Sequence, residues 1–294
     1  LPERFLEAAQ GAGLKGLGVS IDGLPETHDR LRGMPNSYAE AVKVLEWCRR
    51  NGLSSSVNTQ ITRMVIPELQ ALARDIAGHG ARYWQVQLTV AMGNAVDNDS
   101  LLLQPYDLLE IMPVLAEITE WGRSHDFILV PGNNIGYFGP FEVLWRGPDR
   151  TNEHYSGCAA GQAAIGIEAD GTIKSCPSLP KERYGGGNVR DISLSDIWHH
   201  SRAMQMNRTR DTSHLWGRCA TCYYASVCRG GCTWTADALF GRSGNNPFCH
   251  YRALQLAQEG KRERIRKIKD APDIPFATGL FELIVEDMPL EGVV

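Results

Sequence analysis

The stretch GLGVSID at residues 16–22 decides the fold expected for the first half of this chain. It is short and largely apolar, and Gly23 closes it, a pattern that predicts a buried β-strand. Further strands are predicted at residues 54–62 and 83–90, with helices between and after them. Strands that alternate with single helices imply right-handed crossovers and a parallel sheet. We therefore expect an α/β fold.

The predicted helices follow the strands at regular intervals. One begins with a capping box from Ser37 to Glu40, and Cys48 lies on its inward face, where we interpret it as a core residue. Others are predicted from Pro67 and over residues 105–121. Three strand and helix units do not complete a closed sheet. We therefore expect a partial (β/α) barrel whose earlier units precede Leu1, rather than an open sheet.

Composition excludes several classes of protein. The 294 residues hold 30 Lys and Arg against 34 Asp and Glu, which gives a net charge of −4, and 43% are hydrophobic. Without clustered basic residues we expect no nucleic-acid partner, and the basic run at 261–269 is interpreted as a solvated helix face. No apolar run is long enough to cross a membrane, and no signal peptide is recognised at the start. We expect a cytoplasmic protein without a membrane partner.

The cysteines are strongly segregated. Of eight, seven lie between Cys158 and Cys249. A reducing cytosol favours metal binding over disulfides for such a group. Zinc and a 4Fe–4S cluster both take four thiolates, so spacing alone leaves both possible. Gly230 and Gly231 allow backbone N–H groups to approach sulfur, which favours iron-sulfur over zinc.

The second half is predicted to be loop-rich. Asp170-Gly171 indicates a β-hairpin, and Ser193 is a candidate N-cap of a short helix. The expected organisation has four parts: the barrel strands and helices at 1–125, a linker at 126–155, a small cysteine-cluster domain with β-hairpins and short helices at 156–255, and a C-terminal helix and tail at 256–294.

The complete cysteine pattern resembles a known family. Cys158, Gly171 and Cys176, followed by Cys219-x2-Cys222-x5-Cys228-x3-Cys232 and then Cys249, resemble the seven-cysteine SPASM motif of radical S-adenosylmethionine peptide maturases. Residues 19–23, 28–29, 32–33 and 57–59 are similar, more weakly, to the back half of the family's barrel.

The resemblance implies two auxiliary 4Fe–4S clusters. The first would be held by Cys158, Cys176 and Cys232, and the second by Cys219, Cys222, Cys228 and Cys249. Some members supply a fourth ligand to the first cluster just before its first cysteine. The candidates here are Asn152, Glu153 and His154, none of which is a thiol, so an open iron site is also possible.

The resemblance also implies contacts with S-adenosylmethionine. Ser20 and Arg32 would contact its carboxylate and amine, with Asn58 nearby, and Asp22 lies at the same strand end, where ligands bind in parallel barrels. Each has a purely structural alternative: a strand-end hydrogen bond for Ser20, a turn for Asp22 and an ion pair for Arg32.

One part of the family pattern is missing. The 294 residues contain no Cys-x3-Cys-x2-Cys segment, which binds the catalytic cluster in the family. We expect S-adenosylmethionine and a third 4Fe–4S cluster only in an intact protein, and the chain alone to be inactive. The intact protein would modify a ribosomally made peptide or protein, with an electron donor such as ferredoxin or flavodoxin. A non-catalytic iron-sulfur module for peptide binding or electron transfer, and a zinc-binding interaction domain, are the alternatives.

Overall fold

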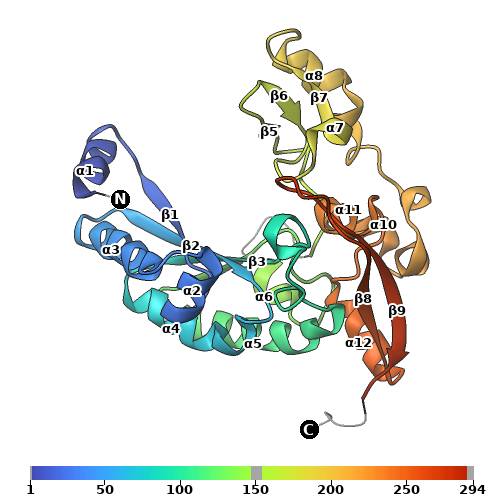
Figure 1. The fold of residues 1–294 in the computed structure, drawn as a ribbon, viewed down its shortest axis with the longest axis horizontal. Helices are drawn as coiled ribbons and strands as arrows, with labels where there is room; N and C mark the ends of the chain where they lie inside the picture. Colours follow the sequence, from blue (N-terminus) through green and yellow to red (C-terminus); the bar gives the residue numbers. More distant parts are fainter. Residues whose placement is uncertain (1, 147–153, 290–294) are drawn as a thin grey trace.

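A parallel sheet forms the first half of the molecule. The structure is a computed structural model that describes residues 2–146 and 154–289. Four strands lie in the order in which they occur along the chain (Figure 1). They are β1 (Gly16–Ser20), β2 (Ser54–Ile61), β3 (Tyr83–Leu88) and β4 (Ile128–Pro131). Every neighbouring pair is parallel, so the predicted α/β class is confirmed.

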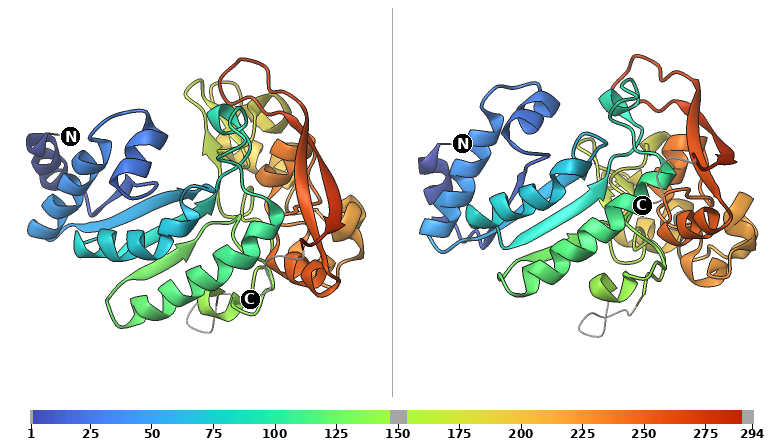
Figure 2. Two further views of the ribbon diagram at one scale, coloured as in Figure 1. Left: turned by 60° about the horizontal axis from the view of Figure 1, so that its bottom comes forward. Right: turned by 90° about the horizontal axis from the view of Figure 1, so that it is seen from below.

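Helices cover one side of this sheet (Figure 2). They are α1 (Glu3–Gly11), α2 (Pro25–Arg32), α3 (Ser37–Arg50), α4 (Leu69–Gly78) and α5 (Leu108–Arg123). Alternate strand residues such as Val57, Trp84 and Val86 are fully buried in one core with Leu72 and Leu115 of α4 and α5. Sequential parallel strands with helices on one side are the winding of a (β/α) barrel rather than of a doubly wound sheet.

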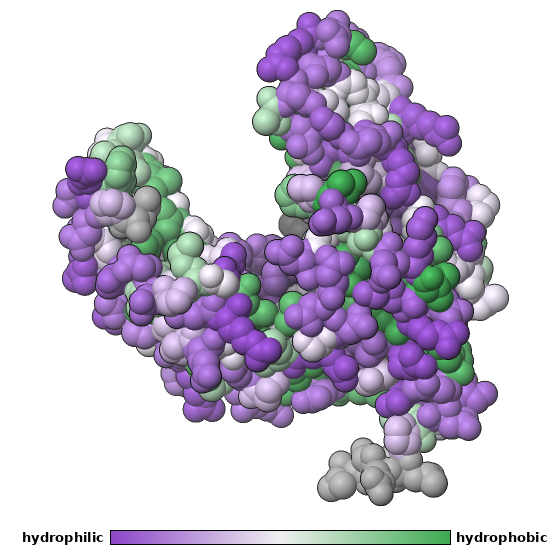
Figure 3. All heavy atoms as spheres, in the orientation of Figure 1, coloured by the Kyte–Doolittle hydropathy of each residue, from purple (hydrophilic) through white to green (hydrophobic). Residues whose placement is uncertain are grey.

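The opposite side of the sheet is polar. A side chain at Gly18 would lie 3.2 Å from both Asn58 Nδ2 and Ser56 Oγ, and these residues line an open groove together with Gln85. Parallel sheets are usually apolar on both faces, so a face of small and polar residues is suited to a ligand. Figure 3 shows that the molecule is hollowed between two arms: one carries β1, and the other is formed by residues 166–200.

The start of α3 corrects one prediction. The helix begins at Ser37, but its N-cap is Asn36 with φ of 64°. The carboxylate of Asp29 in α2 accepts the N–H groups of Asn36 and Tyr38, at 2.6 and 2.8 Å. The predicted capping box between Ser37 and Glu40 is therefore wrong, because a side chain from the preceding helix satisfies these donors. Cys48 of the same helix is fully buried, as predicted.

The cysteine-rich part consists of short elements. Its antiparallel sheet contains β5 (Gly166–Ile167), β6 (Thr172–Lys174) and β7 (Gly185–Asn188). The hairpin turns at Asp170-Gly171, and Ser193 accepts the N–H of Asp196 as the cap of α8, both as predicted. The helices are α6 (Glu142–Arg146), α7 (Lys181–Tyr184), α8 (Leu194–His200), α9 (Arg202–Gln205), α10 (Ala225–Cys228), α11 (Thr233–Phe240) and α12 (His250–Gln258).

The basic run is a strand, so its interpretation as a solvated helix face was wrong. β8 (Lys261–Lys269) pairs with the antiparallel strand β9 (Leu280–Asp287). Alternate residues Glu263 and Ile265 are buried, while Arg262 contacts Glu286 across the pair at 2.8 Å. The alternation has a period of two, which is the spacing of a strand with one buried face.

No helix within residues 2–146 and 154–289 has the length and apolar character needed to cross a bilayer.

Candidate metal centre

Four cysteines line one cavity in the second half of the chain. They are Cys219, Cys222, Cys228 and Cys249. The first belongs to the 3-10 helix Gly217–Thr221, the second follows it, the third ends α10 and the fourth is the N-cap of α12. The cavity has a volume of about 30 Å³, and aromatic rings including Tyr137, Phe138, Tyr224 and Tyr251 form much of its wall.

These four cysteines are half-buried and line the same cavity. Burial is the main cause that raises the pKa of Cys249 to about 12, and the neighbouring Cys219 and Cys222 raise it further. Burial also raises the pKa of Cys228, with Cys249 and Cys219 as the next causes. Without metal the thiols of Cys228 and Cys249 therefore stay protonated at neutral pH. Because metal ligands must be thiolates, loading the site would release protons.

The other three cysteines form a second group. Cys158 lies in the loop before β5, Cys176 follows β6, and Cys232 is the N-cap of α11. Burial raises the pKa of Cys158 to about 11, and Cys232 and Cys176 raise it further. Burial raises the pKa of Cys176 as well, and the neighbouring thiol of Cys232 raises it further. The fold thus sorts the seven cysteines into four and three.

The donor set of the four-cysteine cavity consists of thiols. Among the described residues, no three His, Cys, Asp or Glu side chains come close enough to share one metal ion. In a 4Fe–4S cluster each thiolate binds a different iron, so the sulfurs surround a cage instead of meeting at a point. Four thiols line the one cavity, and all eight cysteines are free rather than disulfide-bonded. The donor set therefore fits an iron-sulfur cluster.

Two glycines separate the two groups. Gly230 and Gly231 follow Arg229, and all three have positive φ, at 82°, 67° and 54°. A side chain on Gly231 would come within 2.9 Å of the Tyr137 ring, and one on Gly230 would come within 2.9 Å of the Gly244 backbone. This left-handed turn lets Cys228 join the four-cysteine group while Cys232, four residues later, joins the three-cysteine group.

Tyr137 connects the two groups, a role that the sequence did not indicate. Its hydroxyl donates to Asn133 O at 2.7 Å and accepts the N–H of Cys232 at 3.0 Å. Its carbonyl accepts the Cys249 thiol at 3.8 Å. Tyr137 is 1% exposed and has a φ of 98°. The segment predicted as a linker therefore packs between the two sets of cysteines.

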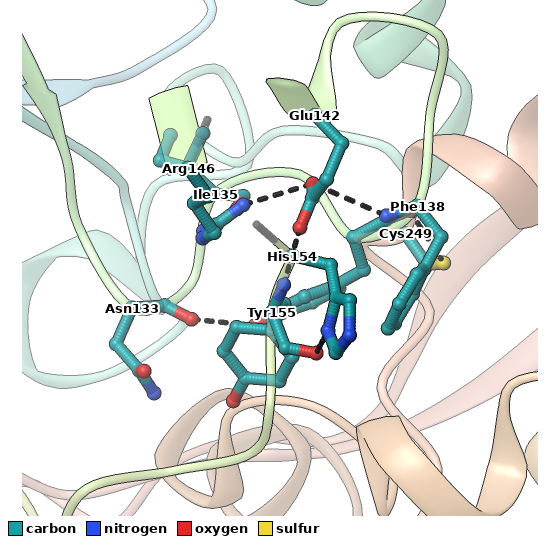
Figure 4. A network of polar contacts seen from close by, with 9 residues as sticks. Asn133, Ile135, Phe138, Glu142, Arg146, His154, Tyr155 and Cys249 are labelled. Carbon is teal, nitrogen blue, oxygen red and sulfur yellow. Dashed lines mark hydrogen bonds and ion pairs between the residues drawn. The ribbon is translucent and has the colours of Figure 1, made fainter. Parts of the chain in front are cut away.

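Glu142 holds this segment in place (Figure 4). Its carboxylate accepts the backbone N–H groups of Phe138 and Tyr155, at 3.3 and 2.6 Å, and pairs with Arg146 at 2.9 Å. The Arg146 guanidinium also donates to Ile135 O. A buried carboxylate with this many donors fixes both ends of the segment next to the cysteines.

The candidates for a fourth ligand of the first cluster have different positions. Asn152 and Glu153 lie outside the described residues. His154 is exposed, and its ring centre is 6.0 Å from that of Phe138, which lines the four-cysteine cavity. Tyr155, the next residue, is 4% exposed, and Cys158 has the largest effect on its pKa after burial itself.

The four predicted S-adenosylmethionine contacts divide into two pairs. Ser20 at the exposed end of β1 lies opposite Asn58 of β2 in the sheet register. Asp22 is 7% exposed, pairs with Arg32 at 2.5 Å and accepts the N–H of Gln60 at 2.8 Å. The first pair is available to a ligand on the open face, whereas Asp22 and Arg32 satisfy each other. Their cofactor roles stay predictions.

A comparison with family models identifies the cysteine-rich segment. Residues 158–223 match the SPASM domain, described as an iron-sulfur cluster-binding domain. The match contains Cys158, Cys176, Cys219 and Cys222.

Curated relatives cover most of the chain at low identity. The chain is 26% identical over 265 residues to an AdoMet-dependent heme synthase of Methanosarcina barkeri, covering 86% of the chain and 72% of the relative. It is 24% identical over 262 residues to the AdoMet-dependent heme synthase of Oleidesulfovibrio alaskensis, with coverages of 82% and 62%. It is 28% identical over 261 residues to the PqqA peptide cyclase of Gluconobacter oxydans, with coverages of 85% and 66%. The chain spans less than two thirds of the last two.

Solved structures share the fold. The chain aligns with anSMEcpe with bound AdoMet at a TM-score of 0.65 and 12% identity, covering 87% of this chain and 65% of that one. Streptococcus suis SuiB bound to S-adenosylmethionine aligns at a TM-score of 0.57 and 16% identity, with coverages of 80% and 52%. The chain therefore shares the fold of these two structures and contains a segment that matches the SPASM domain.

Proposed function

We propose that the cysteine-rich region holds two 4Fe–4S clusters, in a protein that modifies a peptide by radical S-adenosylmethionine chemistry. The observation that carries the proposal is that seven buried or half-buried cysteines lie in a group of four around one cavity and a group of three. The match of residues 158–223 to an iron-sulfur domain supports it.

The four-cysteine group would hold one cluster completely. Cys219, Cys222, Cys228 and Cys249 supply one thiolate for each iron, and the aromatic wall of the cavity excludes water. The three-cysteine group would leave one iron for another ligand, such as a substrate thiolate or amide. When bound, such clusters supply one-electron transfer. The protein contributes orientation, burial and hydrogen bonds to sulfur.

On the sheet, we propose that Ser20 and Asn58 contact S-adenosylmethionine. Both lie toward the carboxyl ends of parallel strands, and Asn58 lines the open polar groove. Asp22 and Arg32 would act indirectly, since their ion pair and the Gln60 contact fix the turn after β1.

The metal content tests this proposal directly. After anaerobic purification and reconstitution with iron and sulfide, we expect about eight irons and eight sulfides per chain, with the absorption and low-temperature electron paramagnetic resonance of 4Fe–4S clusters. Binding of one or two zinc ions without sulfide would instead establish the zinc-binding interaction domain. Incorporation of neither metal after reconstitution would overturn the assignment.

The missing Cys-x3-Cys-x2-Cys segment leads to a second part of the proposal. These 294 residues offer no site for a cluster that presents an open iron to S-adenosylmethionine in the family's way. We therefore expect the reconstituted chain with dithionite to form no 5′-deoxyadenosine. Production of this compound at a rate above a cluster-free control would contradict the expectation. If the chain binds peptide but never takes part in catalysis, the iron-sulfur module is the better description.

The peptide substrate and the electron donor need separate tests. Relatives include a PqqA peptide cyclase, and a SuiB structure contains the precursor peptide SuiA. Because heme synthases are also among the relatives, a tetrapyrrole is the competing substrate class. Fluorescence titration of the reconstituted chain should show saturable binding of precursor peptide and none of coproporphyrin; the reverse result would favour the tetrapyrrole. Ferredoxin or flavodoxin should reduce the clusters in stopped-flow measurements.

A further inference from the structure

Three positively charged side chains are fully buried in the described part of the chain. They are Lys174, Arg210 and Arg252, at 4, 6 and 6% exposure. Lys174 pairs with Glu168, and Arg252 pairs with Glu263 at 2.5 Å. Arg210 has no carboxylate within 4.0 Å among residues 2–146 and 154–289. Arginine stays protonated in proteins, so this residue places inside the molecule a charge that no carboxylate of the described residues compensates.

The position of Arg210 is set from two directions. Its Nη1 donates to the hydroxyl of Thr233, which directly follows Cys232, at 2.9 Å. Its Nη2 donates to Ser243 Oγ at 3.1 Å. Both acceptors are neutral hydroxyls, so they orient the guanidinium without neutralising it.

The chain just before Arg210 is joined to the loop that carries Cys158. Asn207 Nδ2 donates to Ala160 O at 2.8 Å, and Arg208 Nε donates to Gly161 O at 2.6 Å. Arg210 therefore lies between the loop after Cys158 and the start of the helix that follows Cys232. Apart from burial, Cys158 and Tyr155 are the groups that most affect its pKa.

A buried, unpaired charge is strongly unfavourable unless an anion compensates it. The carboxylate in this neighbourhood, Asp237, is already engaged by Arg183 at 2.5 Å and by the Tyr184 hydroxyl at 2.6 Å. Three thiolates around an iron-sulfur cluster would provide the missing negative charge. Cluster reduction adds a further negative charge, and net charge is one of the factors that set a cluster's reduction potential.

The four-cysteine group has a different electrostatic environment. The buried cation that affects it is Arg252, which lowers the pKa of Cys219 after the larger opposing effect of burial. Glu263 neutralises this arginine in a buried ion pair, and Asn245 accepts its other donor at 2.7 Å. The two groups therefore differ in fixed charge: one faces a free cation, and the other faces a neutral pair.

We propose that Arg210 is the counter-charge of the cluster at Cys158, Cys176 and Cys232, and that its charge makes this cluster easier to reduce. The inference rests on the proposed function, because it requires a cluster at these three cysteines. Arg210 would act through space on the cluster and would not be a ligand.

The test measures the reduction potential of each cluster separately. A Cys222→Ser background should retain only the three-cysteine cluster, and a Cys176→Ser background should retain only the four-cysteine cluster. Each is reconstituted, then titrated with dithionite and mediators while the reduced cluster is followed by electron paramagnetic resonance. In the first background, Arg210→Gln should shift the midpoint potential to more negative values, whereas Arg210→Lys should leave it close to the parent. In the second, Arg210→Gln should change nothing.

A matched control replaces the neutral pair. The double variant Arg252→Gln, Glu263→Gln removes two opposite charges together, so it should not shift the midpoint of the four-cysteine cluster.

An unchanged midpoint in Arg210→Gln, with normal iron content, would overturn the inference while leaving the proposed clusters intact. If Arg210→Gln fails to assemble its cluster but Arg210→Lys succeeds, the requirement for charge is supported. Failure of both would show that hydrogen-bond geometry matters instead. An iron-free parent would refute the proposed function itself.

Discussion

The parallel sheet and the cysteine-rich region are stabilised in different ways. Around the sheet, the side chains of strands and helices form one large apolar core in which Trp84, Leu72 and Leu115 are fully buried. Around β5–β7 the buried apolar cluster contains only Ile173, Ile197 and Met204. The cysteine-rich region also contains seven cysteines, of which Cys232 is buried and the other six are half-buried.

This difference teaches what each region requires in order to fold. Burial of apolar surface stabilises the sheet whatever the metal supply. A cysteine-rich region with little apolar core gains stability from metal, because binding free energy adds to folding free energy. We therefore expect the sheet to be metal-independent and the cysteine-rich region to be metal-dependent, and the following predictions test that contrast.

Removal of the metal should have the largest effect. Treating the reconstituted chain with ferricyanide and a chelator should abolish amide protection in residues 158–249, because the cysteine thiolates lose the metal that they bind. The strands β2 and β3 should keep slow exchange. Hydrogen exchange with mass spectrometry measures both regions in one experiment. Equal loss of protection in both regions, or in neither, would break the comparison.

Replacing one cluster cysteine should have the next largest effect. Cys228→Ser removes a thiolate from the four-cysteine group, so we expect about half of the iron and sulfide to be lost. Cys48→Ala is the matched control, since Cys48 is fully buried in an apolar cluster of the sheet region. It should leave the iron content unchanged. Iron loss in the control would mean that the two regions are coupled.

A cavity in the sheet core should affect stability without affecting metal. Leu72→Ala removes a fully buried side chain and should lower the free energy of unfolding of the sheet by about 2–5 kcal/mol. Iron content should stay at the parental value. Ile167→Ala, at a position 66% exposed on β5, serves as the comparison and should change the free energy by less than about 0.5 kcal/mol. Urea denaturation followed by circular dichroism measures both.

Acid should weaken the sheet through His28, with the smallest effect. His28 is 1% exposed, and its Nδ1 accepts the N–H of Asp22 at 3.0 Å. Burial, the main cause, lowers its pKa below the ordinary 6.5. The neutral form therefore stabilises the fold above pH 6.5, and this contribution is lost as the pH falls through the lowered value. The variant His28→Gln should show a flatter dependence of stability between pH 7.5 and 5.5; an unchanged slope would exclude this histidine as the cause.

The sequence predicted the sheet because its signals are local. Alternation of short apolar strands with amphipathic helices is visible within about 15 residues, and the strands occur where expected. The interpretation of residues 261–269 failed because their inward positions, Glu263 and Ile265, include a buried charge. A buried glutamate is recognisable only when its partner Arg252, eleven residues earlier, is known.

The sequence by itself determined which atoms are available for chemistry: seven thiols at spacings that suit iron-sulfur clusters, and glycines that allow a left-handed turn between two of them. The family resemblance already implied how those thiols divide, but only the tertiary structure decided where Tyr137 joins the two groups and which buried arginine has no carboxylate partner among the described residues. The physical reason is that spacing controls neighbours along the chain, whereas burial and Coulomb interactions depend on distances between segments that are far apart in sequence.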